Sequence, residues 1–76
     1  MTRRDYNRFA QMLRNRRSML AFAKSEVDDP EKLKLIEARA KELTWIETEM
    51  VELFKEDNPN FKPQLFRKAA AFGSQS

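Results

Sequence analysis

The chain has 76 residues, a net charge of +3 and 41% hydrophobic residues, which suits one small domain with a single core. It contains no cysteine and no histidine, which excludes disulfides, thiolate or imidazole metal sites, and the usual general base near neutral pH. A single glycine excludes a glycine-rich phosphate loop, and no apolar run reaches the ~20 residues of a membrane span.

The charge is unevenly distributed along the chain. Residues 1–25 hold seven basic residues and one acidic residue, whereas residues 26–57 hold five basic and eleven acidic residues. Residues 58–76 add three basic residues and no acidic one. Two helices of opposite charge that lie against each other would account for this pattern. A basic surface for nucleic acid or for an acidic partner is the alternative.

A long first helix is predicted over residues 3–26. Thr2 can cap its N-terminus, and Asp5, three residues later, completes a capping-box pair. Apolar residues then recur at helical spacing, with neither glycine nor proline to interrupt them. Within this helix Tyr6 is expected in the core, with its hydroxyl at the edge.

A second long helix is predicted over residues 30–56. Asp28 or Asp29 can cap it, and Pro30 is tolerated in its first turn. The short connection makes the two long helices an antiparallel hairpin. The apolar arc of the second helix is wider than one neighbouring helix would cover. This helix must therefore contact something else as well, either a third helix, a second copy of the chain or a partner.

A short third helix is predicted from Pro63 to about Phe72, with Gly73 as its stop. Asn58-Pro59 ends the helix before it, because proline disfavours the helical conformation at the preceding residue. These prolines are therefore assigned structural roles.

The start of the third helix has two candidate caps. If Lys62 holds the cap position, Phe61 and Phe66 fall at the two positions of a hydrophobic staple. Lysine cannot accept hydrogen bonds from the free N–H groups, so Asn60 is the alternative cap.

The predicted fold is all-α: a long antiparallel hairpin, residues 3–26 and 30–56, capped by a short helix over residues 63–72. One helical domain is expected over residues 1–73, and the tail 74–76 is expected to be disordered.

Three charged residues interrupt the predicted apolar arcs: Arg16 in the first helix, and Arg39 and Glu47 in the second. A buried unpaired charge is costly, so each must reach water or find a partner. The expected register places Ser25 level with Pro30. Basic residues then lie level with glutamates near the open end of the hairpin, as Arg3, Arg4 and Arg8 with Glu52, Glu49 and Glu47.

Near the middle of the hairpin, Arg16 and Arg17 instead lie level with Arg39 and Lys41, which are also basic. Together with Arg14 they form a mid-hairpin basic cluster: Arg14, Arg16, Arg17, Arg39 and Lys41. Arginine's planar fork suits phosphate or carboxylate groups, so this cluster is the candidate nucleic-acid-binding site. The alternative is that the long stems cover the core while the charged ends stay in water.

Phe22 and Trp45 lie off the main apolar arcs of their helices. Aromatic residues in such positions are typical either of contact with a third helix or of a protein interface. Both are candidate partner-binding residues. No catalytic, cofactor-binding or metal-binding residues are predicted, and we expect neither enzyme activity nor a small-molecule ligand.

Segments at the two ends of the chain resemble small proteins encoded by bacteriophages and prophages. They are Met1-Thr2-Arg3-Arg4-Asp5-Tyr6, a tryptophan in the following helix, and Asp57-Asn58-Pro59-Asn60-Phe61 with Phe66 and Ala69-Ala70. Those proteins typically end in an Asp-Asn-Pro-x-Phe segment and a short helix, with an aspartate cap where this chain has Lys62. The resemblance implies a phage origin and the cytoplasm of a bacterial host cell, with the virion as the alternative location.

The sequence favours a small non-enzymatic accessory protein that binds a host or phage macromolecule. A nucleic-acid-binding protein that uses the mid-hairpin basic cluster is one alternative. A minor structural component of the virion is another. Self-association as a homodimer is compatible with all three, because a long hairpin with a thin core can pair into a four-helix bundle.

Overall fold

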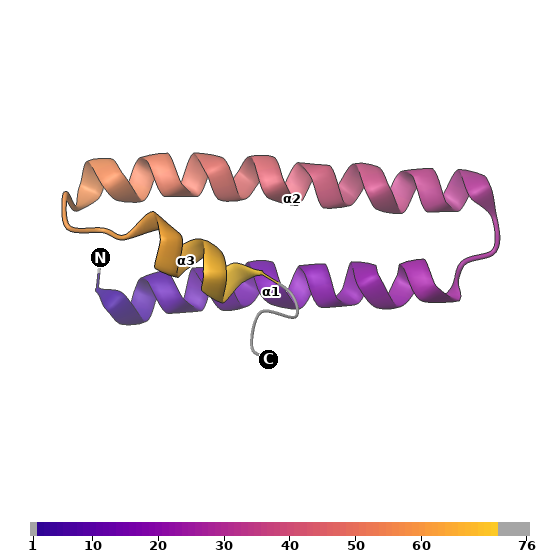
Figure 1. Ribbon diagram of the computed structural model, residues 1–76, viewed down its shortest axis with the longest axis horizontal. Coiled ribbons are helices and arrows are strands. Elements are labelled where there is room, and N and C mark those ends of the chain that lie inside the picture. The colour runs from indigo at the N-terminus through magenta and orange to yellow at the C-terminus, as the bar shows by residue number, and fades with distance from the viewer. Residues whose placement is uncertain (1, 72–76) are drawn as a thin grey trace.

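The computed structural model describes residues 2–71, which form three α-helices. α1 spans Arg3–Glu26, α2 spans Pro30–Asp57 and α3 spans Pro63–Ala70. α1 and α2 form a long antiparallel hairpin, and α3 folds back over the half that contains the N-terminus of α1 (Figure 1). The molecule measures 44 × 24 × 16 Å along its principal axes. The all-α fold and the hairpin are confirmed, and the two long helices match their predicted bounds within one residue.

Side chains at the helix caps determine where α1 and α2 begin. Thr2 Oγ1 accepts a hydrogen bond from the Asp5 backbone N–H at 3.3 Å, and Asp5 Oδ2 accepts one from the Thr2 N–H at 3.1 Å. This is the predicted capping box, and the backbone hydrogen bond from Thr2 is the main reason that the pKa of Asp5 is lowered. Asp29 caps α2 and accepts from the Glu31 N–H at 3.0 Å.

Asn58 organises the turn between α2 and α3 with three hydrogen bonds. Its N–H donates to the Phe54 carbonyl at 2.9 Å, and its carbonyl accepts from the Phe61 N–H at 3.0 Å. Its side-chain Oδ1 accepts from the Asn60 N–H at 3.0 Å. The helix therefore ends at the predicted position, next to Pro59, and the chain reverses within a few residues.

α3 begins with Lys62 at the N-cap and Pro63 at the first helical position, so the alternative with Asn60 as the cap is wrong. The Lys62 side chain makes no capping hydrogen bond. The rings of Phe61 and Phe66 lie 5.7 Å apart, as the predicted hydrophobic staple requires. The start of α3 thus depends on ring packing in place of a polar cap.

α3 ends at Ala70, two residues before its predicted end, and Ala71 follows with an extended backbone. The predicted stop at Gly73 and the tail 74–76 lie outside the described residues.

The core is an aromatic cluster centred on Phe54 of α2. Its ring contacts those of Tyr6, Phe9, Phe61 and Phe66, with centroids 4.9 to 5.5 Å apart. These five rings come from both long helices, from the turn and from α3. Tyr6 is buried as expected, with its hydroxyl 3.4 Å from a carboxylate oxygen of α2.

Two alanines allow α3 to pack closely in the core. Ala10 and Ala70 are 1% and 0% exposed, respectively. The small side chain of alanine at each position lets the helix backbones approach one another. α3 packs against α1 more extensively than against α2, so it covers only part of the wide apolar arc of α2.

The register of the hairpin differs from the predicted one. Arg17 contacts Glu47, whereas the sequence placed Arg8 level with that glutamate. The prediction ignored the direction of side chains, which lean toward the N-terminus of their own helix and so shift contacts in an antiparallel pair. At the closed end of the hairpin, α2 also begins slightly beyond the end of α1, after the three connecting residues 27–29 (Figure 1). The expected pairs of Arg3, Arg4 and Arg8 are therefore wrong.

None of the helices within residues 2–71 is long and apolar enough to cross a membrane.

Candidate functional site

Glu47 is a buried carboxylate that joins all three helices. It is 6% exposed, and no other charged side chain within residues 2–71 is buried. Its Oε1 accepts from Arg17 Nη1 at 2.7 Å, and its Oε2 accepts from Arg67 Nη1 at 3.3 Å. The same Arg17 nitrogen donates to the carbonyl of Ala70 at 2.9 Å, at the C-terminal end of α3. Each carboxylate oxygen thus has a partner, and the cluster fixes the position of α3 on the hairpin.

Arg17, and not Arg16, is the arginine that turns inward on α1. Arg16 is exposed and therefore reaches water, which is one of the two outcomes expected for a charge within the apolar arc. Phe9 and Leu20, the large apolar residues one or two turns from Arg16, are only half-buried, whereas the most buried residue of α1 is Ala10. The available signal was spacing, because Arg17 lies seven residues after Ala10 and therefore on the same side of the helix.

The mid-hairpin basic cluster does not form one surface. Arg17 is engaged with Glu47 and Ala70. Arg14 and Arg16 are two residues apart, which places them about 200° apart around α1, on different sides of the helix. The same spacing separates Arg39 and Lys41 on α2, where both are exposed.

Phe22 and Trp45 are exposed at the outer sides of the hairpin, at 68% and 64% of their surface. Phe22 lies about 180° around α1 from the buried Leu13, and Trp45 lies about 160° around α2 from Glu47. Neither ring therefore contacts the core. Phe22 points outward from α1 and Trp45 points outward from α2, so the two aromatic side chains form two separate candidate sites.

Five further apolar side chains lie on the side of the hairpin that α3 leaves uncovered. We call them the open face: Met12, Met19, Leu35, Ile46 and Leu53, all of which are exposed. The sequence showed them only as margins of the apolar arcs, because the side to which α3 folds could not be read from it.

Two landmarks on α1 place Met12 on the open face. The Phe9 ring contacts Phe54 of α2, with centroids 5.5 Å apart, so Phe9 faces the other long helix. Arg17, which reaches α3, lies about 80° from Phe9 on one side, whereas Met12 lies about 60° from it on the other. Met19 lies seven residues after Met12 and shares its side.

The burial of α2 places the rest of the open face. Val51, on one side of Phe54, is 3% exposed, whereas Leu53, on the other side, is 61% exposed. Ile46 lies seven residues before Leu53 and is also exposed. α3 therefore covers the Val51 side of α2 and leaves the Leu53 side open.

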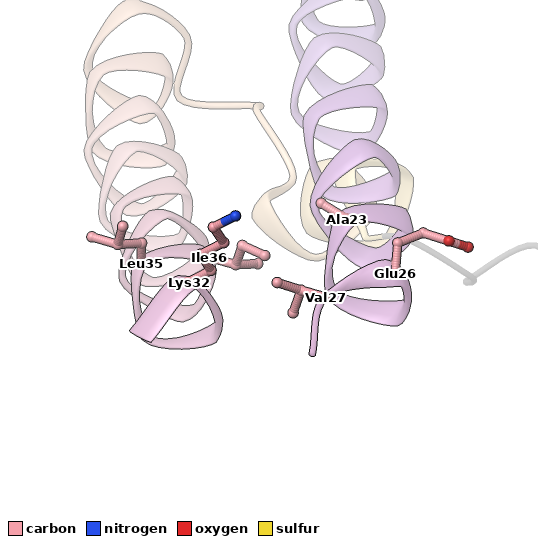
Figure 2. A pocket seen from close by; sticks show the side chains of 6 residues that line it. All are labelled: Ala23, Glu26, Val27, Lys32, Leu35 and Ile36. Atoms are coloured by element: carbon pink, nitrogen blue, oxygen red, sulfur yellow. The ribbon is translucent and has the colours of Figure 1, made fainter. Parts of the chain in front are cut away.

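The closed end of the hairpin is made of two helices only. A shallow hollow there is lined by Ala23, Glu26 and Val27 of α1 and by Lys32, Leu35 and Ile36 of α2 (Figure 2). Val27 and Ile36 point toward each other across the gap, whereas Leu35 points away from α1 (Figure 2). Leu35 also lies five helical turns before Leu53 and so on the same side of α2, which extends the open face toward this end.

The acidic side chains are spread along α1, α2 and the connection between them. Within residues 2–71, no three of them lie together in a way that could hold a metal ion. No protein-family model matches the chain, and neither a curated protein nor a solved structure matches it.

Proposed function

We propose that this protein is a small non-enzymatic accessory protein, of the phage type that its two ends resemble, and that it binds a partner protein. The exposure of Phe22 and Trp45 carries the proposal. Large aromatic side chains are enriched at protein interfaces, where they act as anchors. Neither ring is part of the core formed by residues 2–71, so we expect a partner protein to cover them.

The surroundings of Trp45 favour a protein over a nucleic acid. Lys41 and Glu49, one turn away on either side, are both exposed and supply charges of both signs. An aromatic anchor with a charged rim is the usual anatomy of a protein interface. α2 as a whole holds eight acidic and five basic residues, so a phosphate backbone would be repelled there.

The test is an affinity pull-down from host-cell lysate with the full chain, carried out with and without nuclease. We expect specific proteins to be retained in both cases, and Trp45→Ala or Phe22→Ala to release them. Leu65→Ala, which removes an equally exposed apolar side chain from α3, serves as the control and should retain them.

Two results would count against the proposal. Retention that survives both aromatic substitutions would show that these rings are not the anchors. Retention that disappears with nuclease would favour the nucleic-acid alternative. Because Trp45 is the single tryptophan, its fluorescence gives a direct second readout: partner binding should shift the emission to shorter wavelength.

A further inference from the structure

We infer that the open face is the surface on which a second copy of this chain docks, with α1 of each copy over α2 of the other. The result is an antiparallel four-helix bundle with the two α3 helices on its outside. The five side chains of the open face include neither Phe22 nor Trp45, so the inference does not depend on the proposed function.

The spacing of the apolar side chains suits an antiparallel partner. Met12 and Met19 are seven residues apart on α1, and Ile46 and Leu53 are seven apart on α2. A seven-residue repeat keeps side chains on one side of a helix over two turns. When helices run antiparallel, Met12 can therefore meet Leu53 of the second copy at the same offset at which Met19 meets Ile46.

That offset is within one residue of the offset between α1 and α2 inside one copy. Arg17 of α1 contacts Glu47 of α2 within one copy. A two-fold axis parallel to the helices preserves height along them, so α1 and α2 of different copies face each other at nearly the same level. The pairs of Met12 with Leu53 and of Met19 with Ile46 differ from the Arg17–Glu47 offset by one residue.

The exposed charges favour the arrangement in which α1 of one copy lies on α2 of the other. At the same offset, Glu26 of α1 lies level with Arg39 of the second copy, and helical spacing puts both on the side of the open face. Both side chains are exposed, and neither has an ion pair within residues 2–71. A two-fold axis perpendicular to the helices would instead place α1 on α1.

The net charges of the whole helices favour the same arrangement. α1 holds seven basic and two acidic residues, whereas α2 holds eight acidic and five basic residues. Stacking α1 on α2 joins opposite net charges, and stacking like helices would join equal ones. Charge complementarity of this kind selects partners and register.

The size of the face is sufficient for a stable dimer. The hairpin extends over 44 × 24 Å in the plane of Figure 1. Covering one such face buries on the order of 1,000 Å² per copy, close to the ~800 Å² per partner of a standard protein interface. The face also carries five exposed apolar side chains, whose burial drives association.

The first experiment measures association of the full chain by sedimentation equilibrium over a dilution series. We expect a dimer, and we expect Met19→Asp to raise its dissociation constant by at least about tenfold, because the carboxylate would be buried on an apolar surface. Leu65→Asp places the same charge on an equally exposed leucine outside the open face and should leave the constant unchanged. Circular dichroism checks that both variants remain helical.

The second experiment tests the arrangement. Glu26→Arg should weaken the dimer several-fold, and Arg39→Glu in the same chain should restore it, since exposed ion pairs have modest effects. The chain has no cysteine, so single thiols can be introduced with Met19→Cys and Ile46→Cys. In a glutathione redox buffer, a mixture of the two variants should cross-link as a heterodimer faster than either variant cross-links with itself.

Three outcomes would overturn the inference. One is a chain that stays monomeric at every concentration, and a second is a dimer that Met19→Asp does not weaken. The third is self-cross-linking of Met19→Cys as fast as the mixture, which would place α1 on α1. Trp45 lies outside the proposed interface, so its emission should not change on dilution. A dimer that retains no lysate protein would therefore refute the proposed function alone.

Discussion

Arg17 Nη1 of α1 lies 2.7 Å from Glu47 Oε1 of α2, and the same nitrogen donates to the Ala70 carbonyl of α3 at 2.9 Å. One guanidinium nitrogen therefore satisfies a buried carboxylate and a carbonyl at a helix end. The Arg17 side chain is itself only 19% exposed. Removing it leaves two acceptors without that donor, which is costly where water has little access.

Arg17→Ala should lower the free energy of unfolding by about 2–3 kcal/mol, because Glu47 stays buried with Arg67 as its one remaining partner. Urea denaturation followed by circular dichroism measures the change. Arg8→Ala is the matched control, since Arg8 is an exposed arginine on the same helix, and it should stay within about 0.5 kcal/mol of the parent. Equal losses in the two variants would contradict the role given to Arg17.

Phe61→Ala should release α3 before it unfolds the hairpin. The Phe61 ring lies 4.8 Å from Tyr6, 5.4 Å from Phe54 and 5.7 Å from Phe66, and α3 has no polar cap to compensate for its loss. We expect a loss of about 2 kcal/mol in the stability of α3, seen as faster amide hydrogen exchange there than in mid-α1. If the α3 amides exchanged no faster than in the parent, the staple would not be what holds the helix start.

Ala70→Leu should destabilise the protein by about 2 kcal/mol or more, because Ala70 is 0% exposed and a larger side chain must push α3 away from the core. Ala69→Leu provides the control at the neighbouring, exposed position and should be nearly neutral. Thermal unfolding of the two variants measures the difference. A neutral Ala70→Leu would show that α3 has room to shift.

The stability of the α1 N-terminus should depend on pH through Asp5. The Thr2 backbone hydrogen bond lowers the pKa of this carboxyl in the folded chain. A carboxyl with a lowered folded pKa adds stability above its unfolded pKa and loses it as the pH falls through the folded pKa. The N-terminal turn of α1 should therefore fray in acid, below about pH 4.

An NMR titration of the Asp5 carboxyl checks this expectation. The pKa in the folded protein should be lower than in the same chain unfolded by urea. An equal or higher value in the folded chain would mean that the capping box does not form in solution. Asp5→Asn should remove this part of the acid dependence while leaving the rest of the chain folded.

Local chemistry made the helix bounds predictable. Thr2, Pro30 and the Asn58-Pro59 pair each act on their own backbone or on that of residues within one turn. Such signals do not depend on the rest of the fold, so the sequence alone contains them. Helical spacing also placed Phe22 and Trp45 off the apolar arcs, but it left contact with a third helix open, and the structure shows both rings exposed.

Relations between helices were less accessible. Ala10 and Ala70 are the least exposed core residues within residues 2–71, yet an alanine has little weight in an apolar pattern, so the inward position of Arg17 was missed. The open face could not be predicted, because its position depends on the direction in which the chain turns at Asn58. That direction decides the side of the hairpin on which α3 lies, and the spacing of apolar residues along a single helix does not determine it.

The contacts that hold α3 on the hairpin also affect the order in which the helices fold. Arg17 and Ala70 are 53 residues apart, whereas the hairpin brings α1 and α2 together through a short connection. Contacts that close long loops form late, because the entropy of the open chain is lost before they contribute. We expect the hairpin to form in the folding transition state and α3 to dock after it. Substitutions at Phe66 or Ala70 would then speed unfolding while hardly slowing folding.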